Sequence, residues 1–181
     1  MLSGETANGA FPEDAVKTMA AIAANAEVGI NKYEVYNFIR NWTPKPMDFR
    51  ETMCSGAVQA SMDMKAVLIV VFTDDNATAR LLSKWRPKVP IVVVTTAPHI
   101  VKSCNAHFGL VPMQVDKVTS VSTMMPKVAD FARAHKLAAL TPGDDDADQV
   151  VVIHGKEMAM YTHRLEVSTF IFGDEASALE K

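Results

Sequence analysis

Three aspartates and a lysine are the residues best suited to handle a phosphoryl group. Asp74 and Asp75 follow the apolar run 66–72, Asp116 follows a later apolar run, and Lys156 comes after the last buried one. Two carboxylates can hold Mg²⁺, a third can accept a phosphoryl group, and the lysine can pair with it. The pattern allows a phosphoryl-accepting site, although acids and lysines are equally ordinary residues of solvated loops.

Cysteine and histidine give no sign of a nucleophile or a metal centre. Cys54 and Cys104 fall in expected helices, where a thiol is more often packed than reactive. The five histidines lack the i, i+4 spacing or the paired cysteines of a metal site, and His154, at an expected strand end, is the best exception. No Gly-rich phosphate or dinucleotide loop follows a strand. We therefore expect no metal and no cofactor in this chain.

Charge and composition narrow the class of protein. The 181 residues include 18 Lys+Arg and 21 Asp+Glu, a net charge of −3 that disfavours a dedicated nucleic-acid binder. No apolar run approaches the roughly 18 residues of a membrane span, and the start lacks the pattern of a secretory signal. Two cysteines fit a reducing compartment. We expect a cytoplasmic, globular protein that binds neither nucleic acid nor membrane.

Apolar patterning predicts a sheet between two layers of helices. The run 66–72 is rich in β-branched residues and is typical of a strand buried on both faces, as in a parallel sheet. A helix with a start similar to a capping box, at Asp48 and Glu51, precedes it. Further strands are expected at 91–94, 110–115, 150–153 and 165–172, with helices between the first four. The order predicts an α/β fold, a three-layer αβα sandwich over 48–173 with the alternating strand 165–172 at an edge.

The segments outside this sandwich read differently. Residues 1–11 are a polar loop, and Pro12 fits the first turn of a helix that fades near Gly29. Residues 30–47 carry aromatic residues in mixed spacing and then prolines, so we expect a linker or packing arm there. Residues 174–181 are expected to form a polar tail.

Several motifs resemble the pyruvate kinase family. The string MLSGETA at residues 1–7 is very specific and, with the helix that follows, resembles the last barrel loop and helix of that family. Other matching motifs lie along nearly the whole chain, at 79–87, 90–95, 109–112 and 148–152. The resemblance implies that residues 1–29 are a barrel remnant. It also implies that the domain after the linker has a mostly parallel five-stranded sheet with an antiparallel edge strand.

The resemblance also implies what this stretch lacks. Pyruvate kinases transfer a phosphoryl group from phosphoenolpyruvate to ADP in a (β/α)₈ barrel whose site is built from several loops. The residues that hold Mg²⁺ and K⁺ in the full enzyme belong to segments upstream of Met1. Of the barrel loops only a remnant with Ser3, Glu5 and Thr6 is present, so we expect a C-terminal segment that is non-catalytic when isolated.

Regulated members of the family grip phosphorylated sugars with two loops of this domain. The matching residues here are Thr73, Asp74, Asp75, Asn76 and Thr78 in the first loop, and Lys156 and Arg164 in the second. The family's first loop typically has a basic residue and a glycine, whereas this chain has two acids. A phosphosugar effector is therefore not expected to bind in the manner of those relatives.

The resemblance finally implies partners. Family members form homo-oligomers through this domain, so we expect a homodimer or homotetramer, supported by the exposed edge of strand 165–172. The apolar face of the helix at 12–28 would pack against the barrel domain. The alternative is a stand-alone, non-catalytic module similar to a phospho-accepting receiver domain, with Asp74, Asp75, Asp116 and Lys156 as its site.

Overall fold

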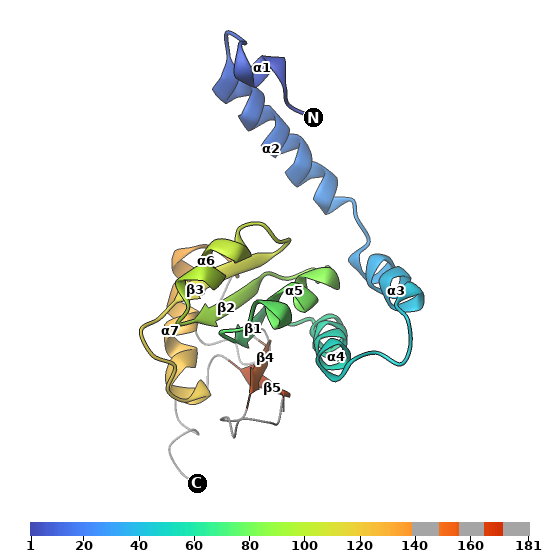
Figure 1. The fold of residues 1–181 in the computed structure, drawn as a ribbon, viewed down its shortest axis with the longest axis vertical. Coiled ribbons are helices and arrows are strands. Elements are labelled where there is room, and N and C mark those ends of the chain that lie inside the picture. Colours follow the sequence, from blue (N-terminus) through green and yellow to red (C-terminus); the bar gives the residue numbers. More distant parts are fainter. Residues whose placement is uncertain (139–148, 156–164, 172–181) are drawn as a thin grey trace.

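The computed structural model describes residues 1–138, 149–155 and 165–171, and it has the expected α/β architecture. Figure 1 shows a sheet with helices on both faces, and a helical arm that extends away from it at the N-terminal end. From residue 49 onward the elements follow each other in the predicted order, with helix and strand alternating until two strands succeed one another at the end. The three-layer sandwich predicted from the sequence is therefore confirmed.

The five strands lie in the order β3-β2-β1-β4-β5. The first four pair in parallel and β5 pairs antiparallel with β4, so the predicted antiparallel edge strand is also confirmed. Each strand lies within two residues of its expected bounds: β1 is Leu68–Phe72, β2 is Ile91–Thr95, β3 is Leu110–Gln114, β4 is Gln149–Gly155 and β5 is Leu165–Ile171.

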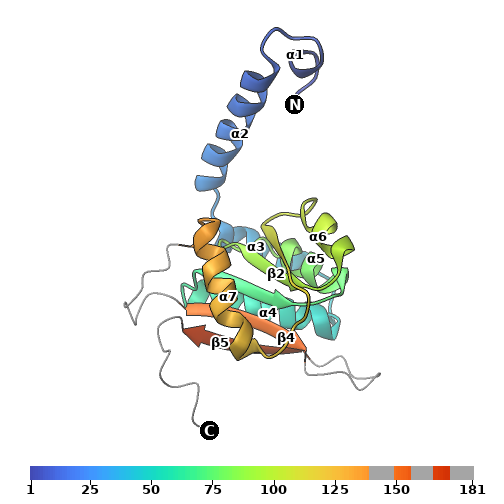
Figure 2. The same cartoon turned by 90° about the vertical axis from the view of Figure 1, so that its left-hand side faces the viewer.

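Alternate residues of the central strands feed two separate cores. On one face, α4 (Phe49–Asp63), α5 (Asn76–Lys84) and α6 (Pro98–Cys104) pack on Ile69 and Val71. On the other face, α7 (Val121–Ala134) packs on the intervening strand residues. Figure 2 shows α7 alone on its side of the sheet. Burial on both faces explains why β1 is a continuous apolar run rather than an alternating one.

The segment 30–47, expected to be a linker, contains a helix that joins the core. α3 spans Lys32–Trp42, and the Asn31 side chain caps it by accepting from the backbone amides of Tyr33 and Glu34. Tyr36 is only 1% exposed and its hydroxyl contacts Ser55 of α4. The sequence reading missed this helix, although Val35, Phe38, Ile39 and Trp42 recur at the i, i+3, i+4 and i+7 spacing of one helical face.

The N-terminal arm consists of α1 (Gly4–Ala7) and α2 (Pro12–Val28). α2 begins and ends where the sequence predicts, at Pro12 and just before Gly29, yet none of its residues is buried. Val16, Ile22 and Val28 are 51%, 58% and 87% exposed. Figure 1 shows the arm standing clear of the sheet. No helix in the described ranges is long and apolar enough to cross a membrane.

Candidate functional site

The order in which the strands are connected singles out one crevice of the sheet as the best candidate for a binding site. β1 leads to β2 on one side, while β4 returns to the opposite side of β1. Ligands of such sheets bind outside the carboxyl ends of the strands at this reversal. The residues there are Thr73 to Thr78 after β1 and His154 near the end of β4. The first effector loop expected from the sequence therefore lies at the switch point.

Asp74 ties the ends of two neighbouring strands together. Its Oδ1 accepts a hydrogen bond from the Thr95 hydroxyl and another from the Thr96 amide, both at 2.7 Å. Its Oδ2 accepts from the Thr96 hydroxyl at 2.8 Å. Burial alone would raise the pKa of Asp74, but these hydrogen bonds favour the charged form and hold the pKa below its usual value. Asp74 is therefore ionised at neutral pH, and both of its carboxylate oxygens accept hydrogen bonds from the protein itself.

Asp75 stabilises the helix that follows. Its Oδ1 accepts from the Ala77 amide at 2.9 Å, which makes it the N-cap of α5. Its Oδ2 forms an ion pair with Arg50 of α4. Thr73 completes the turn, because its hydroxyl oxygen accepts from the Asp75 amide at 2.9 Å and its hydroxyl donates to the Asp75 carbonyl. Both acids of the loop thus have structural partners.

The remaining residues of the loop also make internal contacts. The Ser103 hydroxyl lies 2.9 Å from Asn76 Oδ1 and donates to it, which links α5 to α6. Thr78 is 3% exposed and faces the core rather than the crevice. Cys54 approaches its carbonyl oxygen, with the sulfur at 3.9 Å. Of the first-loop residues, the structure brings Thr73, Asp74 and Asp75 together and turns Thr78 away.

The other predicted site residues do not complete this loop. Lys156 and Arg164 lie outside the described residues. Ser3, Glu5 and Thr6 belong to the arm, where the Thr6 hydroxyl donates to the Ser3 carbonyl at 3.0 Å, and Figure 1 shows α1 far from the sheet. The described ranges contain no cluster of three or more histidine, cysteine, aspartate or glutamate residues that could hold a metal.

The strand order does not support the receiver-like alternative. Receiver folds of the flavodoxin type have the order 2-1-3-4-5, in which the third strand lies beside the first. Here β2 separates β1 from β3, so Asp116, after β3, follows a strand that is not a neighbour of the one that precedes Asp74 and Asp75. The acids counted together in the sequence therefore do not form one site at adjacent strand ends.

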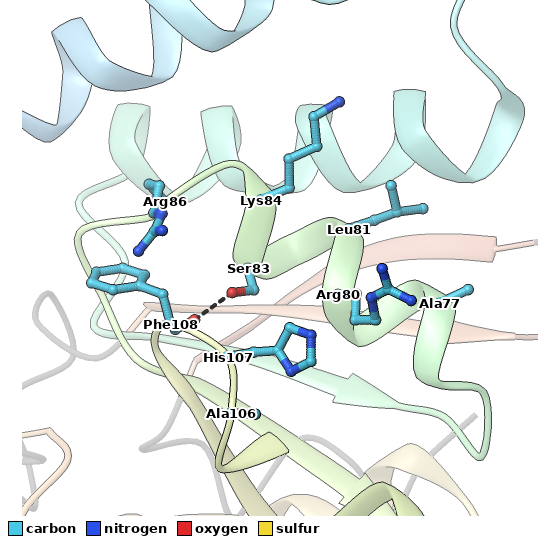
Figure 3. Close-up of a pocket in the computed structure, with 9 residues that line it drawn as sticks. All are labelled: Ala77, Arg80, Leu81, Ser83, Lys84, Arg86, Ala106, His107 and Phe108. Atoms are coloured by element: carbon cyan, nitrogen blue, oxygen red, sulfur yellow. Dashed lines mark hydrogen bonds between the residues drawn. The ribbon is translucent and has the colours of Figure 1, made fainter. Parts of the chain in front are cut away.

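Sequence reasoning missed a second hollow, on the outer side of α5. It has a volume of about 730 Å³ and is lined by α5 and by the turn before β3, as Figure 3 shows. Three basic residues line it: Arg80, Lys84 and Arg86. The signal was present, since the stretch 79–88 contains four basic residues and no acid, but a charge run is usually read as a solvated helix face.

Comparison with known proteins gives the family. The family profile described as pyruvate kinase, alpha/beta domain, matches residues 51–167. Pyruvate kinase 1 of Saccharomyces cerevisiae is 37% identical over 174 residues, which cover 93% of this chain and 34% of the yeast protein. Pyruvate kinase of Dictyostelium discoideum is 34% identical over 158 residues, covering 86% of this chain and 30% of its own length.

Solved structures agree with these relatives. Pyruvate kinase of Cryptosporidium parvum, solved in complex with ADP, superposes with a TM-score of 0.81 at 30% sequence identity, covering 94% of this chain and 33% of that one. The chain spans about a third of the length of the proteins it matches. The profile match, the relatives and the superposition all include the sandwich described above, and the chain belongs to the pyruvate kinase family, with its alpha/beta domain at residues 51–167.

Proposed function

We propose that these 181 residues serve as the assembly and regulatory part of a pyruvate kinase. The phosphoryl transfer from phosphoenolpyruvate to ADP, with its Mg²⁺ and K⁺, is the work of the whole enzyme. The observation that carries the proposal is the family's alpha/beta domain with an uncovered aromatic surface beside it. The absence of a membrane-spanning helix in the described ranges is compatible with the cytoplasmic location that we propose for it.

The assembly surface is the outer side of α3. Phe38 and Trp42 are 64% and 76% exposed, and their ring centroids lie 6.1 Å apart. Paired aromatic rings that face water are the residue types enriched at protein interfaces. The opposite side of α3 is anchored to α4 through Tyr36, so the pair is held on a fixed support. A second copy of the chain is the partner we assign to this surface.

Two other features support contacts with further protein. β5 lies at one edge of the sheet and pairs, among the described strands, only with β4. An edge strand offers backbone groups to a symmetry mate. Separately, α2 leaves Val16, Ile22 and Val28 exposed on different sides of the helix. We assign this helix to a barrel domain of the kind that pyruvate kinases carry, as its last helix.

Regulation through the loop Thr73 to Thr78 takes a form other than phosphosugar binding. Asp74 is ionised and accepts hydrogen bonds from donors at the carboxyl end of β2. Asp75 forms an ion pair with Arg50 and caps the start of α5. A phosphate in the same loop would meet the Asp74 charge. At an effective dielectric near 20, two unit charges about 4 Å apart repel by about 4 kcal/mol, which exceeds the roughly 0.3–1 kcal/mol gained from a helix N-terminus.

Three measurements test the proposal. Sedimentation velocity at micromolar concentration is expected to show species heavier than the 19.7 kDa chain, and a monomer alone would contradict the assembly role. Calorimetric titration with fructose 1,6-bisphosphate and 2,6-bisphosphate is expected to show no micromolar binding without metal. A coupled assay of these 181 residues with phosphoenolpyruvate, ADP, Mg²⁺ and K⁺ is expected to show no turnover above a heat-killed control, because the resemblance assigns to them a single barrel loop, the one with Ser3, Glu5 and Thr6.

A further inference from the structure

We propose that the basic hollow beside α5 binds a small anion that carries a phosphoryl group. Nothing in the family comparison assigns this hollow, and it shares only Ala77 with the loop Thr73 to Thr78. It has a volume of about 730 Å³ and lies between α5 and the turn Ala106–Phe108. That volume is within the roughly 300–1,000 Å³ of small-molecule sites.

The charged residues that line the hollow are all basic. Arg80, Lys84 and Arg86 line it, and its lining includes no aspartate or glutamate. Lys84 is neutralised by an ion pair with Glu51 of α4. Within the described ranges, neither the Arg80 nor the Arg86 guanidinium pairs with a carboxylate. Two arginines that line one open hollow with no acid in its lining create a positive potential there, which favours the binding of an anion.

Phe108 holds part of the lining of the hollow in place in the free protein. The Ser83 hydroxyl donates to the Phe108 carbonyl at 2.8 Å, which ties the turn to α5. The Arg86 guanidinium lies 4.5 Å from the centroid of the Phe108 ring, and the Lys32 ammonium of α3 lies at the same distance from it. Figure 3 shows Arg86 above the ring and the Ser83 bond beneath it. Cation–π contact therefore holds two positive groups around one ring.

The backbone also contributes to the position of Arg86. It follows the C-cap Trp85 of α5 and has a φ of 52°, the left-handed conformation that ends many helices. Its amide donates to the Ser83 carbonyl at 3.1 Å. The same residue, Ser83, thus holds Arg86 by its carbonyl and Phe108 by its hydroxyl. The backbone hydrogen bond and the contact with the Phe108 ring restrict Arg86 in the free protein, which lowers the entropy lost when a ligand binds.

The chemistry of the cationic groups selects the occupant. A guanidinium presents a planar fork of N–H donors that matches the oxygens of a phosphate group. The imidazole of His107 also lines the hollow, and its Nδ1 lies 2.8 Å from the Ser103 carbonyl, so the neutral ring carries its proton on that nitrogen. A nucleic acid is disfavoured, because the chain carries a net charge of −3. The remaining candidates are a small phosphorylated molecule and a free oligophosphate, which both present phosphate oxygens to the arginines.

The experiment uses the full 181-residue chain and inorganic pyrophosphate as the probe, followed by calorimetry and by the shifts of arginine side-chain resonances. We expect saturable binding with a Kd below about 1 mM. Arg80→Ala and Arg86→Ala are each expected to weaken it by about tenfold or more, the range of one charge-assisted hydrogen-bond pair. Lys127→Ala is the matched control, an exposed cation on α7 across the sheet, and it should leave the affinity unchanged.

Further ligands separate the sources of the anion and test its chemistry. Glycerol 3-phosphate stands for a phosphate ester, and its binding at least as tightly as orthophosphate would identify a phosphorylated small molecule as the occupant. Tighter binding of pyrophosphate alone would identify an oligophosphate. Citrate that binds as tightly as pyrophosphate would overturn the phosphoryl assignment. The site itself would be refuted by the absence of saturable binding, or by equal losses in Arg80→Ala and Lys127→Ala.

Discussion

Asp74 and Thr96 are joined twice, through the amide of Thr96 to Oδ1 at 2.7 Å and through its hydroxyl to Oδ2 at 2.8 Å. This double link fastens the loop after β1 to the loop after β2, on the side of β1 away from the crevice with β4. The two acids that the sequence offered as candidates for phosphoryl chemistry or phosphate repulsion are therefore part of the framework of the loop. Their charge and their hydrogen bonds have separate, measurable consequences.

Replacing Asp74 is expected to lower stability at neutral pH. Asp74→Ala removes three hydrogen bonds to a partly exposed carboxylate and should cost about 1–2 kcal/mol in the free energy of unfolding. Urea denaturation measures this cost. Asp116→Ala removes an exposed acid after β3, a strand that β2 separates from β1, and is the control, expected to change stability by less than about 0.5 kcal/mol. Equal effects of the two substitutions would contradict the role given to Asp74.

The cost of Asp74→Ala should depend on pH in one direction. The pKa of Asp74 in the folded chain is lowered from the usual 3.8, so its charged form stabilises the fold above that value. The contribution is lost as the pH falls through the folded pKa. The difference in unfolding free energy between the parent chain and Asp74→Ala is therefore expected to shrink from about pH 7 to about pH 2.5. A difference that grows on acidification would show that the pKa is raised instead.

The hydroxyl of Tyr36 is expected to anchor α3 to α4. It lies 3.1 Å from the Ser55 carbonyl and 2.9 Å from the Ser55 hydroxyl, in a buried position. Tyr36→Phe keeps the ring but leaves these groups without their partner, and should cost about 1–2 kcal/mol. Tyr33→Phe, on the same helix and 54% exposed, should cost less than about 0.5 kcal/mol. Thermal and urea unfolding compare the two variants, and the anchor is refuted if they are equally stable.

Cys54 is expected to be inert in the folded chain. Burial, with a smaller contribution from Glu51 and against the effect of Arg50, raises the pKa of its thiol to about 12. At a pH near 8 only about one thiol in ten thousand is ionised, and the thiolate is the reactive form. In a Cys104→Ala variant, a thiol reagent should modify Cys54 only after urea is added. Rapid modification of the native variant would contradict this packing.

Much of the fold could be predicted because its signals are local. The apolar run of β1, the Asp48 N-cap of α4 and the Pro12 start of α2 each depend on neighbouring residues, and the structure has all three. The antiparallel edge strand came from the family resemblance. α3 also has a local signal, the helical spacing of Val35, Phe38, Ile39 and Trp42. The sequence does not show that Tyr36 faces the core while Phe38 and Trp42 face outward. Only the tertiary contact with α4 decides which face is buried.

Less of the candidate site could be predicted, because most of its contacts join residues that are distant in sequence. The sequence places Thr73, Asp74 and Asp75 at a strand end, which the structure bears out. It does not reveal that Asp74 accepts from Thr95 and Thr96, because those donors come from a different strand about twenty residues away. Arg86 and Phe108 are equally distant in sequence and meet only across a turn. Contacts of this kind depend on strand order, which no local pattern encodes.

The assembly role is tested most directly by sedimentation equilibrium of the chain beside a Phe38→Ser, Trp42→Ser double variant. Both side chains are exposed, so the variant should keep the far-ultraviolet circular dichroism of the parent. Tyr33→Ser, exposed on the same helix, is the control. We predict that the parent and Tyr33→Ser sediment as a dimer or larger, and that the double variant falls to the 19.7 kDa monomer. A parent that is monomeric throughout, or a double variant that associates as well as the parent, would contradict the account.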